Sequence, residues 1–375
     1  MVILSDCKVR DFKKHRRGER SEPARRGEPP KSEVLAGGDK RAYPRRAVPY
    51  FKTQFYSRLF RKGELMEIIN YVYGKTDTVY ATPSVMALGF FDGVHLAHRQ
   101  LIGEASRIAR EEGLSLSVFT FSEGSGLKVG AQRIYSDREK LSIFESLGVE
   151  RAIMCDFRSV KELSAEQFVS DVLIATFGLK YAVYGFNYRC GKGRSAGSSE
   201  LRKILDGHGI GSLILDELYY RDTTLSSTLI RALLSDGKIE EANRALGEPY
   251  FIRGKTCHGL GVGRGMGIPT VNTDTPPERL IVPSGVYLTE TDIGSVSYPS
   301  LTNVGVCPTF SERPRHAETY ILGYSGDLYG EELKVKFLSK LRDEVRFDGE
   351  KELTEQINID KTKALSLYGK LKTQK

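Results

Sequence analysis

Two histidines, His95 and His98, follow a turn that begins at Gly89 and ends at Gly93. The start of a helix leaves backbone N–H groups without partners and carries a partial positive charge, so it binds anions such as phosphates. Imidazole N–H groups in the first turn can donate further hydrogen bonds to phosphate oxygens. A metal pair or two structural histidines would explain a His-x-x-His spacing taken by itself. With the glycine turn we interpret the segment as a polyphosphate site made by Gly89, Phe90, Asp92, Gly93, His95 and His98.

A second helix start carries the hydroxyl cluster Ser226, Ser227 and Thr228, followed by Arg231. One hydroxyl can cap the helix, and the remaining hydroxyls and free N–H groups form an anion site. Arg231 adds a permanent charge to the first turn. Ordinary helix capping accounts for this cluster in isolation. Together with the histidine turn, it predicts the second half of one nucleotide site.

The elements that position these residues follow from hydrophobic periodicity. Over residues 78–247, apolar runs of strand length alternate with amphipathic segments, which predicts a parallel sheet covered by helices on both faces. Ligands of such sheets bind at the carboxyl ends of the strands, where the histidine turn falls. The expected strands are 85–88, 116–121, 152–157, 181–186 and 213–218, and the expected helices are 99–110, 137–147, 165–177 and 199–205.

The pattern changes after residue 249. Short alternating runs broken by glycine and proline, at 250–253, 285–291, 320–324 and 333–337, predict a small antiparallel β-barrel. A last helix is expected over 350–371. The length of 375 residues allows two domains, so we expect a basic disordered extension at 1–64, an α/β domain at 65–247 and a barrel domain at 248–375.

The net charge of +8 belongs to the extension. Residues 1–64 hold 18 Lys and Arg against 8 Asp and Glu, a charge of +10, and the other 311 residues hold 38 against 40, a charge of −2. The extension has too few apolar residues to order itself, so a solvated tail is expected rather than a nucleic-acid-binding arm. Five cysteines without a Cys-x-x-Cys pair indicate a reducing cytoplasm and no zinc site. No apolar run is long enough to cross a membrane.

Three separated motifs resemble those of the bacterial bifunctional riboflavin kinase/FAD synthetase family. They are GFFDGVHLAH at 89–98, GFNYRCGKGR at 185–194 and SSTLIR at 226–231. The resemblance extends from about residue 85 to the C-terminus. It implies a Rossmann-like nucleotidyltransferase domain that transfers AMP from ATP to FMN. It also implies that the histidine turn and the SSTLIR helix hold the triphosphate, and that the adenylyl-transfer site includes His95, His98, Asn187 and Arg231.

A glycine-rich segment at 254–272 resembles the phosphate-binding part of riboflavin kinases. Its six glycines, among them Gly259, Gly263 and Gly267, permit close approach of the backbone to phosphates, although glycine-rich hairpins without function exist. The sequence at 269–272 resembles the Pro-Thr-Ala-Asn signature of these kinases, which implies that Thr270 and Asn272 help to hold Mg²⁺ and ATP phosphates. Their oxygen atoms suit Mg²⁺.

Glu318 is the expected general base of the barrel. A carboxylate within hydrogen-bond reach can accept the proton of a primary hydroxyl while the γ-phosphoryl group transfers, and the resemblance implies a catalytic glutamate here. By spacing alone, Glu318 could instead be a solvent-facing residue of a strand. Arg342 and Phe347 are expected at the flavin, and a surface pair of Arg342 with Asp343 or Glu344 is the alternative for this arginine.

The resemblance thus implies a bifunctional enzyme that phosphorylates riboflavin to FMN and adenylylates FMN to FAD, with ATP as co-substrate and Mg²⁺ as cofactor. A riboflavin kinase with an inactive adenylyltransferase domain is one alternative, because Ala97 stands where the family usually has glycine and residues 122–126 replace its Pro-His-Pro element. A flavin-responsive protein that binds nucleic acid through the extension is another. The main hypothesis expects no nucleic-acid or membrane partner and leaves the oligomeric state open.

Overall fold

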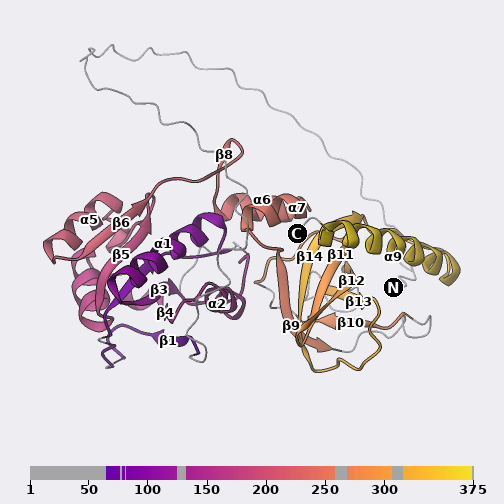
Figure 1. Ribbon diagram of the computed structural model, residues 1–375, viewed down its shortest axis with the longest axis horizontal. Coiled ribbons are helices and arrows are strands. Elements are labelled where there is room, and N and C mark those ends of the chain that lie inside the picture. Colours follow the sequence, from indigo (N-terminus) through magenta and orange to yellow (C-terminus); the bar gives the residue numbers. More distant parts are fainter. Residues whose placement is uncertain are drawn as a thin grey trace, which may run out of the picture.

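The computed structural model describes residues 65–76, 78–80, 82–124, 132–257, 268–274, 276, 278–305 and 316–373. These residues form an α/β unit and, beside it, a β-barrel with a long C-terminal helix (Figure 1). The predicted extension at 1–64 lies outside the described residues. None of the helices in the described part of the chain has the length and apolar character of a membrane span.

The α/β unit contains a six-stranded sheet in the order β1-β4-β3-β2-β5-β6. Every neighbouring pair is parallel, which confirms the predicted sheet type. Two separate apolar cores cover its faces: along β2, Val85 and Ala87 belong to one core, and Met86 and Leu88 belong to the other. Alternate side chains of a strand point to opposite faces, so both faces are buried. The strands are β1 (Glu67–Tyr71), β2 (Ser84–Leu88), β3 (Ser115–Phe121), β4 (Arg151–Cys155), β5 (Leu179–Gly185) and β6 (Gly211–Leu215).

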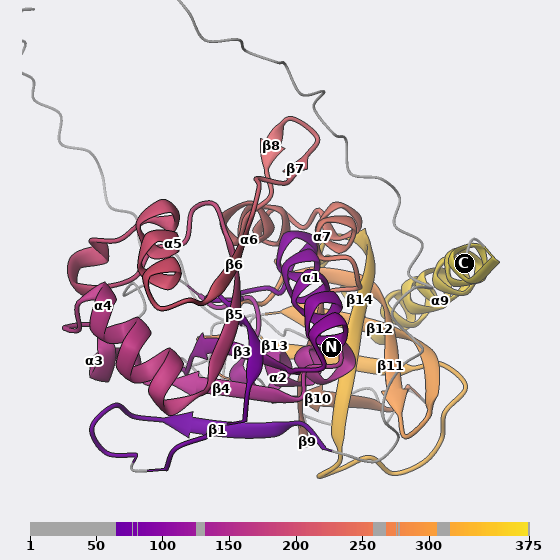
Figure 2. The same ribbon diagram turned by 60° about the vertical axis from the view of Figure 1, so that its left-hand side comes forward.

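Helices pack on both faces of this sheet, and a small hairpin projects from the unit (Figure 2). The first core contains α1 and α2, and the second contains η2 and α5. The helices are α1 (Leu96–Glu112), α2 (Asp137–Ser146), α3 (Phe157–Val160), α4 (Ala165–Gln167), η2 (Phe168–Thr176), η3 (Lys192–Arg194), α5 (Ser198–Gly207), α6 (Ser227–Ser235) and α7 (Ile239–Leu246). The hairpin consists of β7 (Tyr219–Tyr220) and β8 (Thr223–Thr224).

The second unit is a closed six-stranded barrel in the order β10-β13-β12-β11-β14-β9. All of its pairs are antiparallel, which confirms the predicted architecture. Its strands are β9 (Phe251–Cys257), β10 (Thr270–Thr273), β11 (Gly285–Ile293), β12 (Val296–Gly305), β13 (His316–Ile321) and β14 (Glu332–Arg342).

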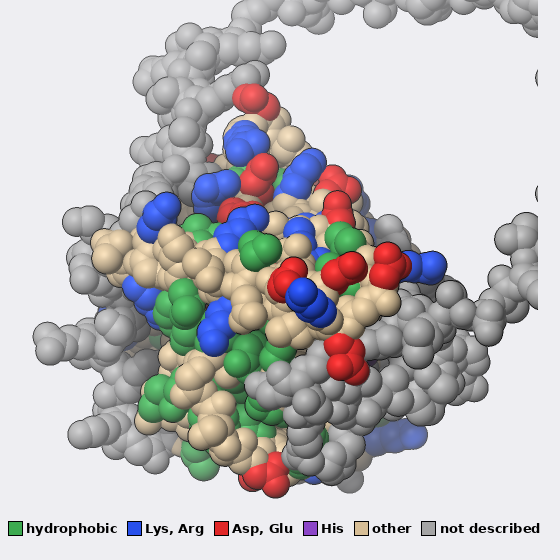
Figure 3. All heavy atoms as spheres, turned by 90° about the vertical axis from the view of Figure 1, so that its right-hand side faces the viewer, with side chains coloured by type: hydrophobic (Ala, Val, Ile, Leu, Met, Phe, Trp, Pro, Cys, Tyr) green, Lys and Arg blue, Asp and Glu red, His purple; other side chains and the backbone are tan. Residues whose placement is uncertain are grey.

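The final helix, α9 (Glu350–Thr373), lies along the barrel and confirms the helix predicted at 350–371. Its Leu353 and Ala364 are buried. Near its C-terminus, Tyr368 Oη donates to Glu290 of β11 at 2.6 Å, and Lys372 lies 2.6 Å from the same carboxylate. The outer surface at this end of the molecule carries both hydrophobic and charged side chains (Figure 3).

Several strands differ from their predicted positions. The strand expected at 320–324 is β13, which ends at Ile321 because the chain turns at Gly323, whose φ is +80°. The strand expected at 213–218 is β6, which begins at Gly211. A Cβ atom at Gly211 would lie 2.5 Å from the ring of Tyr181, so the pairing of β6 with β5 requires glycine there. Strands β1, β10 and β12 were not predicted as strands.

The two units share a buried interface. Glu139 of α2 and Arg279 of the barrel unit form an ion pair of 2.6 Å, and both side chains are 2% exposed. Arg279 also donates to Tyr250 Oη and to the carbonyl of Phe251. The Arg279 guanidinium lies about 5 Å from the ring centres of Tyr135 and Tyr250. Backbone hydrogen bonds of Arg133 with Glu278 and Leu280 also join the two units. The interface therefore combines aromatic contacts with hydrogen bonds.

Candidate active sites

The histidine turn lies at the carboxyl end of β2, where the sequence predicts it. The chain leaves the strand at Leu88 and reaches α1 at Leu96 through a tight backbone path, in which Phe91 and Val94 have φ values of 54° and 38°. Gly93 has a φ of +84°, and a Cβ atom there would lie 2.8 Å from Ile134 Cδ1. The positive φ therefore favours glycine here.

His95 and His98 stack on each other, with ring centres 3.8 Å apart. His95 is the N-cap residue of α1, and its side chain does not cap the helix. Burial, and secondarily the nearby Arg99, lowers the pKa of His95 to about 3, and burial also lowers the pKa of His98 well below its usual value. Nδ1 of each ring is buried and has no hydrogen-bond partner among the described residues. Both imidazoles are therefore neutral and able to bind a further polar group.

The start of α6 contacts the histidine turn directly. Ser227 Oγ donates to the backbone carbonyl of Asp92 at 2.6 Å, and Arg231 lies 2.5 Å from the Asp92 carboxylate. The Ser226 side chain caps α6 by accepting a hydrogen bond from Leu229 N. Two segments 135 residues apart in the sequence thus come into contact, with the start of α6 against Asp92 of the histidine turn. Thr228 lies in the same first turn.

Other predicted residues lie at the same edge of the sheet. Asn187 is exposed in the turn that follows β5, and β5 is the neighbour of β2. Phe90 stacks on Phe121 at the end of β3. Two cations that the sequence analysis missed, Arg133 and Lys140, each lie 5.9 Å from the centre of the Phe90 ring. Lys140 is on the buried face of α2 together with Ile143 and Phe144. A lysine at the helical spacing of buried apolar residues is unusual, and this spacing could have identified Lys140 as a candidate site residue.

On the outer surface of the barrel, five residues of five neighbouring strands form one cross-strand row, here called the outer row. Directly opposed residues in antiparallel strands share a face of the sheet. In order across the strands β10, β13, β12, β11 and β14, the residues of the outer row are Asn272, Glu318, Asn303, Val286 and Arg342. Thr270 Oγ1 donates to Glu318 Oε1 at 2.6 Å, so the expected neighbours Thr270, Asn272 and Glu318 do lie together.

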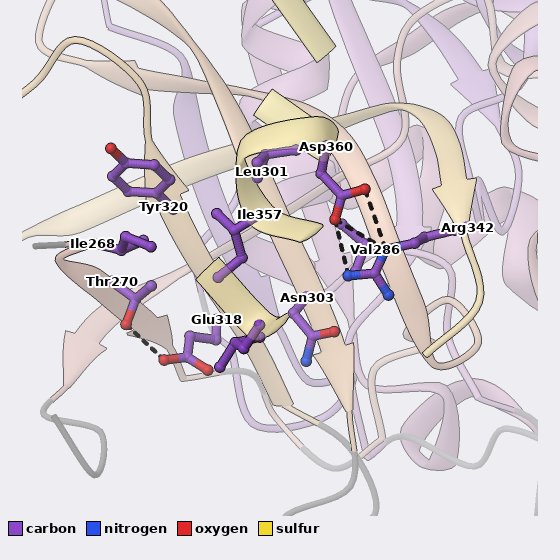
Figure 4. Close-up of a pocket in the computed structure, with 11 residues that line it drawn as sticks. Ile268, Thr270, Val286, Leu301, Asn303, Glu318, Tyr320, Arg342, Ile357 and Asp360 are labelled. Atoms are coloured by element: carbon purple, nitrogen blue, oxygen red, sulfur yellow. Dashed lines mark hydrogen bonds and ion pairs between the residues drawn. The ribbon is translucent and has the colours of Figure 1, made fainter. Parts of the chain in front are cut away.

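Four residues of the outer row, all except Asn272, border a cavity between the barrel and α9 (Figure 4). At one end of the cavity, Glu318 meets Thr270. At the other end, Arg342 forms a two-point ion pair with Asp360 of α9, with contacts of 2.9 and 2.8 Å. The alternative, a surface pair of Arg342 with Asp343 or Glu344, is not found among the described residues: Arg342 pairs with Asp360, and Asp343 pairs with Lys340. The remaining lining residues are mostly apolar: Ile268, Val286, Leu301, Tyr320, Leu353 and Ile357.

Comparison with known proteins gives a consistent result for both units. A family model described as FAD synthetase matches residues 78–229, and one described as riboflavin kinase matches residues 246–368. A bifunctional riboflavin kinase/FMN adenylyltransferase of Bacillus subtilis is 36% identical over 298 residues, which cover 77% of this chain and 94% of that protein. The protein of the same description from Escherichia coli K12 is 32% identical, covering 76% and 93%. The chain belongs to this family.

A solved structure has the same fold. The crystal structure of a protein named macrolide-efflux protein from Streptococcus pneumoniae matches with a TM-score of 0.72 and 29% sequence identity, and covers 79% of this chain and 98% of that one.

As a member of the bifunctional riboflavin kinase/FMN adenylyltransferase family, this protein combines two activities. FMN adenylyltransferase activity corresponds to the α/β unit and riboflavin kinase activity to the barrel with α9.

The remaining predicted residues have different outcomes. Gly259, Gly263 and Gly267 lie outside the described residues. Phe347 lies 5.8 Å from the guanidinium of Arg342. Asp360 was missed by the sequence analysis, although it shares the helical spacing of the buried Leu353 and Ala364, and an acidic residue on such a face is a usable signal.

Proposed function

We propose that riboflavin is phosphorylated at the outer row, with Glu318 as the general base. The primary hydroxyl of riboflavin is a weak nucleophile, and a carboxylate within hydrogen-bond reach can accept its proton while the γ-phosphoryl group moves from ATP to the hydroxyl oxygen. The observation that supports this role is the hydrogen bond between Thr270 and Glu318 beside Asn272, at the end of an apolar cavity. In this proposal Arg342 and Phe347 contact the flavin ring at the opposite end.

Mg²⁺ would be held by Thr270 and Asn272 in this proposal. Their hydroxyl and amide oxygens are hard ligands of the kind that Mg²⁺ prefers, and the Glu318 carboxylate is adjacent. Mg²⁺ usually retains water ligands and binds nucleotide phosphates, so two protein oxygens are sufficient. When bound, it neutralises phosphate charge during transfer.

We assign the second ATP to the site formed by the histidine turn and α6. A phosphate oxygen of FMN attacks the α-phosphorus of ATP, the new P–O bond forms FAD, and pyrophosphate leaves. This reaction needs alignment and charge neutralisation rather than a protein nucleophile. Neutral His95 and His98 can each donate one hydrogen bond, and Arg231 supplies positive charge. Asn187 would lie at the transferred AMP. The nucleotide site would be completed by Gly89, Phe90, Asp92, Gly93, Ser226, Ser227 and Thr228.

We also propose that the reactions take place in the cytoplasm. Among the described residues, Cys155 and Cys190 are free cysteines, as is usual in a reducing compartment.

Two crossed substitutions test the assignment of the sites. Glu318→Gln removes the base, so FMN formation from riboflavin should fall at least about 100-fold, whereas FAD formation from supplied FMN should stay near the wild-type rate. His98→Ala should have the opposite effect. Both products are separated by chromatography and measured with and without Mg²⁺, whose removal by a chelator should stop both reactions.

Matched controls are Glu355→Gln on the exposed side of α9 and His208→Ala at the end of α5, two exposed residues that neither line the cavity nor belong to the histidine turn or α6. Loss of both activities in either active-site variant would contradict separate sites. Full FMN formation by Glu318→Gln would remove Glu318 as the base.

A further inference from the structure

Asn303 of β12 has a buried amide oxygen that nothing described in the structure satisfies. The residue is 8% exposed, and its Oδ1 has no hydrogen-bond partner among the described residues. Buried side-chain oxygens are normally hydrogen-bonded, so an exception needs an explanation. Asn303 also lines the cavity between the barrel and α9. A ligand in that cavity is the simplest partner for this oxygen.

The outer row shows where Asn303 lies relative to the proposed base, Glu318, and to Arg342. Asn303 is directly opposite Glu318 on one side and Val286 on the other, and Val286 is opposite Arg342. Neighbouring strands are about 4.8 Å apart, so Asn303 is one strand from the proposed base and two strands from Arg342. The close-up shows the same order, with the Asn303 side chain between Glu318 and Arg342 (Figure 4).

The substrate must extend along this row. Riboflavin consists of a flat ring system and a ribityl chain with several secondary hydroxyls, and its terminal primary hydroxyl must reach Glu318. The ring fits the apolar part of the cavity beside Arg342, against Val286 and Ile357, so the ribityl chain passes Asn303 on the way to Glu318. A side-chain amide has both a donor and an acceptor, as does a secondary hydroxyl.

We infer that Asn303 binds a ribityl hydroxyl of riboflavin and thereby positions the terminal hydroxyl at Glu318. This inference rests on the proposed kinase site and adds a substrate-binding residue to it. Oδ1 accepts a hydrogen bond from the ribityl O–H, and Nδ2 can donate to the same or the next hydroxyl. An apolar side chain at this position would remove both bonds and leave the ring contacts in place.

The test compares riboflavin with lumiflavin, which has the same ring but a methyl group in place of the ribityl chain. In the full-length protein, Asn303→Leu should raise KM for riboflavin roughly 3- to 10-fold, the factor expected for one neutral hydrogen bond, and should lower kcat. The inhibition constant of lumiflavin against riboflavin in the same kinase assay should change less than about twofold, and KM for ATP should not change. FAD formation from supplied FMN reports on folding.

Two further variants complete the design. Asn358→Leu, on the exposed side of α9, is the matched control and should leave all constants unchanged. Asn303→Ser keeps a hydroxyl and should give an intermediate KM for riboflavin; it carries the same test if Asn303→Leu does not fold. An equal weakening of lumiflavin and riboflavin, an unchanged KM for riboflavin, or a change confined to KM for ATP would each overturn the inference. Failure of the proposed site itself would appear separately, as full kinase activity in Glu318→Gln.

Discussion

Burial lowers the pKa of both histidines of the turn, assisted at His95 by Arg99 and at His98 by His95, so both rings are neutral. A neutral imidazole can donate one hydrogen bond, whereas a pair of adjacent imidazolium groups would repel each other. Positive charge at this site therefore comes from Arg231 and the helix starts, and from Arg133 and Lys140 beside Phe90. The sequence predicts the histidine pair, but it does not show the burial that lowers the pKa of both rings.

The Asp92 carboxylate holds the guanidinium of Arg231 in position. Its carboxylate accepts from Ile134 N at 3.0 Å and pairs with Arg231, and the Asp92 side chain is 4% exposed. Asp92→Asn keeps an acceptor for Ile134 N but removes the charge that holds Arg231. FAD formation from supplied FMN should fall by about 10-fold or more, the factor for a hydrogen bond to a charged group, and FMN formation should be unchanged.

The control for this variant is Asp236→Asn at the C-terminal end of the same helix, where Asp236 pairs with Lys238 and both side chains are more than half exposed. It should leave FAD formation intact. Wild-type FAD formation in Asp92→Asn would show that the ion pair is not needed, and equal loss of both activities would point to unfolding instead.

At the scale of elements, α9 is held on the barrel by charged contacts at two places. Arg342 and Asp360 join it to β14, and the carboxylate of Glu290 on β11 receives Tyr368, Lys372 and Lys336. The first contact borders the cavity, so the position of α9 determines the shape of the proposed flavin site.

The Glu290 cluster predicts a pH dependence of stability. Burial opposes ionisation of Glu290, but hydrogen bonds from Lys372, Tyr368 and Lys336 outweigh it and lower the pKa from 4.5 to about 2. A carboxyl with a lower pKa in the folded state stabilises the fold above pH 4.5, and this contribution is lost as the pH falls from 4.5 towards 2. Glu290→Gln should therefore destabilise the protein by about 1–3 kcal/mol at pH 7 and by much less at pH 3.

Urea unfolding at the two pH values measures this difference. Glu240→Gln, at the start of α7 and exposed at the surface, is a matched carboxyl control and should show little effect at either pH. If Glu290→Gln lost the same stability at pH 3 as at pH 7, the contribution would come from shape rather than charge.

The elements differ in how well the sequence predicts them. Strands β2 and β3 are mostly apolar and buried on both faces, and their predicted positions agree with the structure. Strand β1 is an edge strand whose Ile68 is 49% exposed, so its sequence lacks a clear apolar pattern. The outer row could not be predicted, because it depends on strand order and register: Asn272 and Glu318 are opposed in the barrel although 46 positions separate them in the sequence.

At the scale of the whole molecule, composition and periodicity predict two units but not how they meet. Glu139 reads as an ordinary charged residue at the start of α2, and Arg279 lies between strands β10 and β11. In the structure both are buried in the interface, where Glu139 also accepts from the backbone N–H of Arg253. Charged residues are rarely buried unless they are paired, so neither position can be assigned to an interface without its partner.

Because the Glu139–Arg279 pair joins the two units, we expect the two units to unfold together. Arg279→Met leaves the Glu139 carboxylate buried without its cation, which should cost about 3–5 kcal/mol, and should separate urea unfolding into two transitions. Adding Glu139→Gln should recover part of the loss, because the unpaired charge is then removed. The control is Arg138→Met, the neighbouring residue, whose pair with Glu332 also connects the units but whose side chain is 67% exposed. An exposed ion pair such as Arg138–Glu332 contributes about 0–1 kcal/mol to the free energy of unfolding. If Arg279→Met and Arg138→Met changed the unfolding curve equally, the buried pair would not couple the two units.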